Sequence, residues 1–514
     1  MFEESLIALL GEQADPVAAG WKLRELTEQA ADQGAKLTRQ TADQAERLSA
    51  SDPAIVGALL RAIHTVVLRS GQPTILQLKP EWLTTIESAL PTLTPNRSLL
   101  LQLLAMIRTP ESLGELVRLL KQDRPRDWIE GGQILSPLMQ HNDWPVEAFY
   151  PEVLDCLQYS TLASPLLDLS NYLVRSGRVA VHPAADRLPM LNTLLGEVSG
   201  RLGSFEENPR AFGDDVETVH KMLGEAVALA VSLCDTVGLI GDESSIGKLN
   251  QTIDLKHRRV QCEAAGALAR LGDDLGQKRL LEMTADPAAR LRAIHYLDEL
   301  GVGDSVDPQY RSDKATAEAE LALWLTQPSQ MGVPPTAIEV IDRRRMLWPS
   351  FNDPMDIFLL RFEYHFGEQT YSHVGITGPV TFALSSDVAN LPTDDIYAMY
   401  AGWHAEHPEI FAVSEDQFND AQKRVMGTFQ KHLDRLGYES IKPELLGFFL
   451  DEQSGVFSAV REDTACIVVT DGLETIEQVV AGRMRPLTPG DVFNLFKGRK
   501  MLRTFNSSQV ESGE

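Results

Sequence analysis

The feature that most constrains the fold is an internal repeat within residues 258–301. A shift of 29 residues superimposes four apolar positions on four others: Cys262 on Leu291, Ala265 on Ile294, Leu268 on Leu297 and Leu271 on Leu300. Because these positions recur every three residues, they lie on one face of a helix. Gly272 and Gly301 follow the two apolar runs, and glycine adopts the left-handed conformation that ends many helices. A helix, a tight turn and a second helix, repeated along the chain, predict an α-solenoid.

Weaker copies of this layout extend the predicted solenoid to residues 95–328. Residues 99–120 match residues 231–253 at an offset of 133. Further helices are predicted at 127–139, 146–157, 165–175, 184–202 and 215–237, and the Pro- and Gly-containing stretch 204–213 is predicted to be a loop insertion. Residues 1–94 form a predicted N-terminal helical region, with amphipathic segments at 5–10 and 17–31.

The repeat units at 260–281 and 289–301 resemble HEAT-like repeats, in particular the short repeats of phycobilin-lyase subunits and of many bacterial scaffold proteins. The matching positions are Ala264-Ala265, Leu268, Leu271-Gly272-Asp273, Ala293, Leu297 and Leu300-Gly301. The resemblance covers residues 230–301 well and 95–230 loosely, and it implies a right-handed stack of helix pairs. Because all these positions serve packing, the resemblance implies no catalytic residue and no bound bilin.

Composition limits the class of partner. The chain has 47 Lys and Arg against 73 Asp and Glu, a formal net charge of -26. So acidic a surface repels phosphate groups, which argues against nucleic acid and anionic membranes as partners. The four cysteines are widely spaced, which is typical of buried thiols in a reducing compartment. The first residues lack the basic start of a signal peptide, and no uninterrupted apolar run reaches about 18 residues. We therefore expect a cytoplasmic protein without a spanning helix.

After residue 354 the apolar period changes from three or four residues to two, which predicts an α+β domain with an antiparallel sheet over 355–505. A hairpin is predicted from 357–366 and 370–377, with a three-residue loop at 367–369 that pairs Phe362 with Val374 and Leu360 with Ile376. Three further strands are predicted at 445–450, 456–461 and 465–470, and helices at 394–406, 414–436 and 489–502. Residues 329–354 are predicted to be a linker with a short helix at 336–345, and 506–514 a mobile tail.

The predicted hairpin contains the first group of pocket candidates. Its register sets His365 opposite Tyr371 and Glu363 opposite His373. Such a group is compatible with a small polar pocket or a metal site, and equally with ordinary cross-strand pairs on a half-solvated sheet.

A second group follows on the next predicted helix. His404 and His407 lie three residues apart, beside Trp403, so both imidazoles can face one way. A histidine near a helix C-terminus is also favourable against the helix dipole, with no function required. A zinc site needs three or four ligands, and no third accompanies these two. We therefore predict no metal, no cofactor and no catalytic residue. The basic run 343–345 is expected to pair with nearby carboxylates or to anchor the linker rather than to bind a phosphate, because no Gly-rich loop opening a helix accompanies it.

The leading interpretation is a non-enzymatic scaffold or adaptor whose solenoid binds a protein or peptide, with the acidic balance favouring a basic partner. One alternative is an enzyme whose α+β domain acts on a small molecule while the repeats recruit the target. A third is a lyase-like or chaperone-like protein that holds a cofactor in the solenoid. The sequence determines neither the partner nor the oligomeric state.

Overall fold

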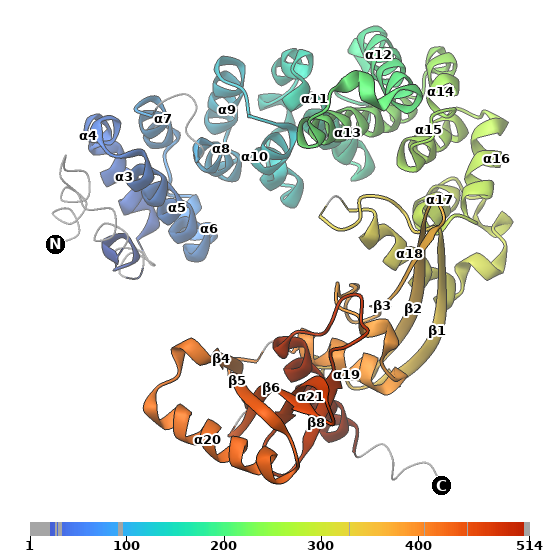
Figure 1. The fold of residues 1–514 in the computed structure, drawn as a ribbon. Coiled ribbons are helices and arrows are strands. Elements are labelled where there is room, and N and C mark those ends of the chain that lie inside the picture. The colour runs from blue at the N-terminus through green and yellow to red at the C-terminus, as the bar shows by residue number, and fades with distance from the viewer. Residues whose placement is uncertain are drawn as a thin grey trace. The chain divides into compact units, whose positions relative to one another are not determined.

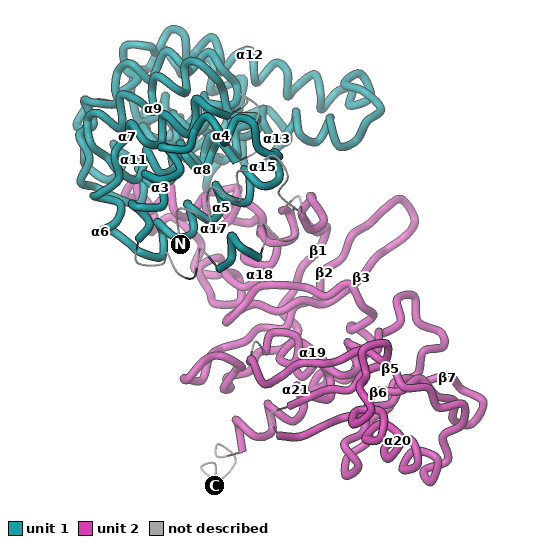
Figure 2. Tube along the Cα trace, turned by 90° about the vertical axis from the view of Figure 1, so that its left-hand side faces the viewer, with its two compact units in different colours: residues 1–280 teal, residues 281–514 magenta. Residues whose placement is uncertain are grey.

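The computed structural model describes residues 21–25, 28, 33–90, 96–327, 329–405, 407–449 and 451–507. The chain divides into two compact units, residues 1–280 and 281–514 (Figure 2). It is mostly helical, and its C-terminal unit contains two antiparallel sheets (Figure 1). The segment predicted at 5–10, most of that at 17–31 and most of the predicted tail lie outside the described residues.

The described part of unit 1 is helical. Its α-helices are α3 (Gly34–Asp43), α4 (Ala45–Ala50), α5 (Pro53–Ser70), α6 (Gln72–Ile75), α7 (Pro80–Ser88), α8 (Arg97–Ile107), α9 (Pro110–Gln122), α10 (Trp128–Gln140), α11 (Ser160–Arg175), α12 (Leu188–Glu207), α13 (Val216–Ile240), α14 (Ile246–Thr252) and α15 (Arg258–Arg270). Helix α16 (Asp274–Met283) crosses from unit 1 into unit 2. Local capping fixes several starts: the Asp127 side chain accepts from the Glu130 N–H of α10, and Asp215 accepts from the Thr218 N–H of α13.

Helices of unit 1 contact one another in sequence order. Helix α8 packs on α10, α10 on α11, α11 on α13, and α13 on α15. A second set lies alongside, in which α12 contacts both α13 and α14, and α14 contacts α15. The burial of leucines such as Leu103, Leu166 and Leu233 between these helices supplies the core.

Two details of unit 1 differ from the sequence prediction. The segment predicted as a helix at 146–157 forms two 3₁₀ helices, η1 (Val146–Ala148) and η2 (Glu152–Gln158). Pro151 lies between them, and proline cannot donate the backbone hydrogen bond that a continuous α-helix needs there. The predicted loop 204–213 is also partly helical, because α12 continues to Glu207 before the short 3₁₀ helix η4 (Pro209–Phe212).

Unit 2 combines helices with two sheets. Its helices are α17 (Pro287–Glu299), α18 (Asp313–Leu325), α19 (Thr393–His404), α20 (Asp420–Arg435) and α21 (Pro489–Asn506). The first sheet has the order β1 (Ala337–Met346), β2 (Met355–Phe366), β3 (Gln369–Thr377). The second has the order β4 (Ile410–Ser414), β5 (Glu439–Phe449), β6 (Glu452–Arg461), β7 (Thr464–Thr470), β8 (Thr475–Val479). The predicted antiparallel α+β region is therefore confirmed.

The layers of unit 2 follow from its apolar clusters. One face of the first sheet, including Phe358 and Leu360, packs on Leu321 of α18. The other face packs on α19, which with α21 lies between the two sheets (Figure 1). Helix α20 covers the far face of the second sheet. Helix α18 contacts all three strands of the first sheet, and the compact unit that contains this sheet spans residues 281–514.

The prediction of a short helix at 336–345 is wrong, because this segment is strand β1. Its residues alternate between exposed and half-buried along the whole strand, and it pairs antiparallel with β2. Ile338, Val340 and Asp342 are the half-buried positions of this alternation, which is typical of a strand. Pairing with β2 stabilises the strand conformation of this segment.

The predicted hairpin register is wrong by one residue. The loop has two residues, since Phe366 pairs with Gln369, and Gly367 adopts a φ of 64° that a tight two-residue turn needs. Phe362 therefore lies opposite His373 rather than Val374, and Leu360 opposite Gly375 rather than Ile376. His365 pairs with Thr370 and Glu363 with Ser372.

Candidate functional site

The structure makes His373 a packing residue. Its side chain is 4% exposed, Nδ1 accepts the Val374 N–H at 2.7 Å, and Nε2 lies 2.5 Å from the Ser386 carbonyl oxygen. Nδ1 also lies 3.1 Å from the Val374 carbonyl oxygen. Because Nε2 faces a carbonyl oxygen, it carries a proton and donates to Ser386. Burial lowers the pKa of His373, which favours the neutral ring with Nδ1 unprotonated. Both ring nitrogens are thus engaged by backbone.

Tyr371 is the one other candidate that lies beside His373. Their ring centroids are 6.0 Å apart, and Phe362 stacks on the imidazole at 6.0 Å. The Arg485 guanidinium lies 5.7 Å from the Tyr371 ring. Burial raises the pKa of Tyr371. These contacts form a packed aromatic cluster.

The remaining hairpin candidates face elsewhere. His365 is exposed, with Nδ1 3.0 Å from the Thr370 hydroxyl. Glu363 is half-buried, and its backbone carbonyl accepts the Thr336 N–H at 2.7 Å. Both residues lie on the opposite face of the hairpin from His373, because His373 pairs with Phe362 and side chains alternate along a strand.

The candidates at the end of α19 and just after it each contact a different neighbour. Trp403 is 50% exposed and packs against Phe382 in a tilted arrangement, with ring centroids 4.1 Å apart. His404 accepts the Trp348 Nε1–H at Nδ1, 3.2 Å away. His407 is exposed, and its Nδ1 accepts the Glu409 N–H at 3.3 Å. The seven candidates thus form no common site, and among the described residues no group of three His, Cys, Asp or Glu side chains is placed to hold a metal ion.

The basic run on β1 is neutralised by carboxylates, as predicted. Arg343 pairs with Asp313 and Asp356, and Arg344 pairs with Asp342 and Asp394. Arg345 pairs with Asp356 at 3.0 Å. All three arginines are therefore engaged within unit 2.

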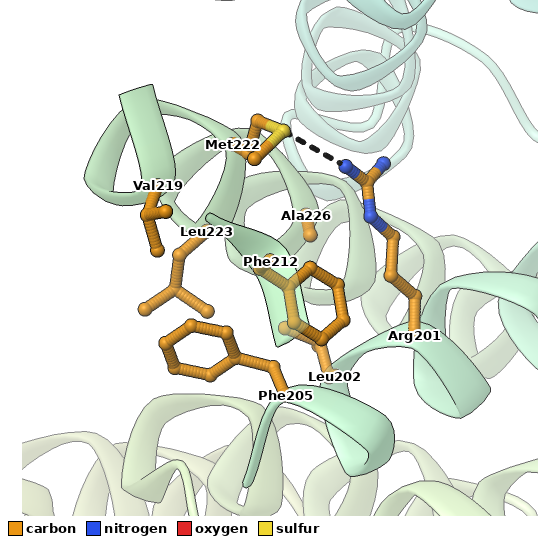
Figure 3. Close-up of a pocket in the computed structure, with 8 residues that line it drawn as sticks. All are labelled: Arg201, Leu202, Phe205, Phe212, Val219, Met222, Leu223 and Ala226. Carbon is orange, nitrogen blue, oxygen red and sulfur yellow. Dashed lines mark hydrogen bonds between the residues drawn. The ribbon is translucent and has the colours of Figure 1, made fainter. Parts of the chain in front are cut away.

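A different site forms between the end of α12 and the start of α13 (Figure 3). We call it the α12–α13 pocket; its lining is Arg201, Leu202, Phe205, Phe212, Val219, Met222, Leu223 and Ala226. Its empty volume is about 230 Å³, including the space open to solvent. Because that volume includes solvent-open space, the site is a shallow apolar recess and encloses far less than the roughly 300–1,000 Å³ typical of small-molecule sites.

Local sequence explains why this pocket exists. Val219, Met222, Leu223 and Ala226 follow helical spacing, which gives α13 an apolar face at its start. Phe205 and Phe212 close the side toward α12 and contact each other edge to face, with ring centroids 5.4 Å apart.

One polar side chain lines the pocket. The Arg201 guanidinium donates to the Met222 sulfur at 3.4 Å (Figure 3). The pocket is otherwise apolar and holds no group that could act as a general acid, base or nucleophile at neutral pH.

Charged side chains flank the pocket residues in the sequence. Glu207 at the end of α12, Asp214 before α13 and Glu217 in its first turn are exposed, and so are Arg210 and Lys221. Asp215 caps α13, and its hydrogen bonds to Thr218 lower the pKa of its carboxyl, so it stays ionised. Carboxylates outnumber cations among these exposed residues, so this stretch favours cationic groups.

Sequence reasoning missed this pocket because it assigned 204–213 to a loop. The available signal was the pair Phe205 and Phe212 in an otherwise polar stretch, followed by apolar residues at helical spacing. Two aromatic residues in an otherwise polar stretch predict that the stretch packs locally instead of forming a solvated loop.

Two described helices, α5 and α13, are long and apolar enough to cross a membrane by length and composition, and 44% and 61% of their most apolar windows are buried inside the protein. Core helices of globular proteins meet the same criterion. The expected cytoplasmic location thus stays a prediction.

Comparison with known proteins gives little. No family model matches the chain, and no curated protein matches it. A solved structure described as "Lipid-protein interactions in lipovitellin" is similar over 84% of this chain and 49% of its own, with 12% identity and a TM-score of 0.31. The chain spans about half the length of that structure, and so low a TM-score supports no argument about fold or function.

Proposed function

We propose that this chain is a non-enzymatic interaction scaffold whose helical unit 1 binds a protein or peptide with basic character. The observation that carries the proposal is the α12–α13 pocket, an apolar recess between two helix ends, flanked in the sequence by exposed charged residues among which carboxylates outnumber cations. Binding energy at protein interfaces concentrates where a large side chain enters such a recess. The charges around the recess mainly determine which sign of charge the partner must have and how fast it associates.

The helices of unit 1 are proposed to form a right-handed stack of HEAT-like pairs. The sequence order of their contacts supports this, since each helix meets its near neighbours. Support also comes from the turns: Gly241 and Gly272 both have a φ of 80°. Both follow helix ends at matching points of the repeat.

The proposed partner presents one bulky apolar side chain flanked by Lys or Arg. The apolar side chain would displace solvent from Phe205, Phe212 and Met222. The flanking cations would lie near Glu207, Asp214 and Glu217. Because those carboxylates are exposed, their contribution falls as salt rises.

The test is affinity capture with the full chain from the native cell extract at low and high salt. The proposal predicts a partner that is retained at low salt and reduced at high salt. Recovery of no salt-sensitive protein or peptide would count directly against it.

A further inference from the structure

Strand β4 is an edge of the five-stranded sheet in unit 2 (Figure 1). Its residues pair with β5, from Ile410 opposite Phe449 to Ser414 opposite Leu445. Among the described strands, none pairs with its other side. An edge strand leaves a row of backbone donors and acceptors that another extended chain can use.

The orientation of the β4 backbone identifies those groups. The Ile410 N–H donates back to the His407 carbonyl at 2.9 Å, so it faces away from β5. Backbone direction alternates along an antiparallel strand, which turns the N–H and C=O of Ala412 outward as well. No described residue hydrogen-bonds to these two outward groups.

The edge strands β1 and β8 carry features that hinder added strands, and the edge strand β3 is partly covered by an antiparallel bridge from Ile376 to Phe382. Strand β1 has charged side chains, including Glu339 and Arg343, and an irregular register between Val340 and Asp342. Strand β8 has Glu477 at its centre. Charges and bulges at edges prevent unwanted pairing. The sequence of β4, IFAVS, has no charge, no proline and no glycine, and its pairing with β5 is regular.

The side chains of β4 also suit an added strand. Phe411 is 49% exposed and stacks on Phe448 of β5, with ring centroids 4.6 Å apart. A strand laid along β4 would cover part of the Phe411 ring, which adds apolar burial to the backbone hydrogen bonds.

We propose that β4 accepts an extended segment of a partner protein, added as a further strand to the five-stranded sheet. Charge decides against a second copy of this chain as occupant. Exposed Glu409 precedes the strand, and exposed Glu415 and Asp416 follow it. Antiparallel pairing of two β4 strands would bring Glu409 of each copy beside these acids of the other, and like charges there repel. The favoured occupant is an extended peptide with Lys or Arg among its apolar residues.

The test uses the full chain and a fluorescent seven-residue probe of alternating Lys and Val with blocked ends. Binding is measured by anisotropy with the unchanged protein, with Ala412→Pro and with Ala412→Val. Proline removes the outward N–H of residue 412, whereas valine keeps it and favours a strand. A second probe with every backbone amide N-methylated keeps the charge but cannot donate to the edge, so it tests the proposal without any variant.

The proposal predicts binding to the unchanged protein and to Ala412→Val, with affinity at least about tenfold weaker for Ala412→Pro and for the methylated probe. Equal binding of both probes, or equal binding by both variants, would overturn it, because the contact would then be general attraction to an acidic surface. Absence of binding would overturn it too. If the protein dimerises with rising concentration and Ala412→Pro abolishes the dimer, then β4 pairs with a second copy of this chain. That result would reject the peptide as the occupant.

Discussion

The His182 Nε2 atom lies 3.0 Å from Oδ1 of Asn171, while the Ala184 N–H donates to His182 Nδ1 at 3.1 Å. An accepting Nδ1 requires the proton on Nε2, so His182 is neutral and donates to Asn171. The same Asn171 oxygen accepts the Thr236 hydroxyl at 2.9 Å, and its amide donates to the Ser232 carbonyl at 3.3 Å. This buried network joins α11 to α13.

Protonation of His182 should destabilise unit 1. Burial lowers the pKa of His182 to about 4, against about 6.5 in the unfolded chain. The contribution of the neutral His182 ring to the free energy of unfolding is fully present above about pH 6.5. It is lost progressively as the pH falls toward 4. Between pH 7 and pH 5, the free energy of unfolding should fall by about 2 kcal/mol more in the unchanged protein than in His182→Gln. Urea unfolding at the two pH values measures these free energies. An equal loss of stability in the unchanged protein and in His182→Gln would refute the prediction.

Replacement of Lys497 by methionine should stabilise unit 2. Lys497 is 7% exposed, and burial lowers its pKa to about 8. Its Nζ lies 5.4 Å from the Phe493 ring centroid, and none of the ion pairs between described residues includes it. Since an unfolded lysine has a pKa of about 10.4, the charged form destabilises the fold at pH 7. Lys497→Met should raise the free energy of unfolding there by about 1–3 kcal/mol.

The pH dependence of that gain is a further check. The unfolded chain binds more protons than the folded one between about pH 8 and 10.4, so the unchanged protein gains stability as pH rises through that window. The difference in the free energy of unfolding between Lys497→Met and the unchanged protein should therefore shrink between about pH 8 and 10.4. Exposed Lys431 provides the matched control, and Lys431→Met should change stability by less than about 0.5 kcal/mol. An equal effect of both variants would contradict the account.

Close packing of α19 on α21 depends on Gly402. A Cβ at this position would lie 1.9 Å from the Asn494 carbonyl oxygen, so the two helices would have to separate. Gly402→Ala should destabilise the protein by more than about 2 kcal/mol. Gly427 in α20 is the control: a Cβ there meets no atom within 4 Å in the part of the chain that the structure describes, and alanine should stabilise that helix by about 0.5–1 kcal/mol. Thermal unfolding distinguishes the two, and similar shifts of both variants would exclude this packing argument.

Local signals predicted much of the fold. The start of α13 after Asp215, the strands β6 and β7 and the helix α21 all follow from caps, alternation and helical spacing that lie within one segment. All four cysteines are buried and free, as their wide spacing predicted.

Features that depend on distant partners were missed. Strand β1 has enough charge to suit a solvated helix, and its pairing with β2 determines its conformation. The hairpin register depended on whether Gln369 belongs to the turn or to β3, which composition does not decide. The α12–α13 pocket requires Phe205 and Val219 to meet across a turn, so no single segment reveals it.

The central claim is that the α12–α13 pocket binds a partner, and a matched pair of substitutions in α13 tests it most directly. Val219 lines the pocket, whereas Val216, one turn earlier, is 78% exposed and does not line it. Calorimetric titration of the full chain with the captured partner should give affinity at least about tenfold weaker for Val219→Asp, because a carboxylate in the recess must be desolvated. Val216→Asp should bind within about twofold of the unchanged protein. Equal affinity of the two variants would contradict the assignment of this pocket as the binding site.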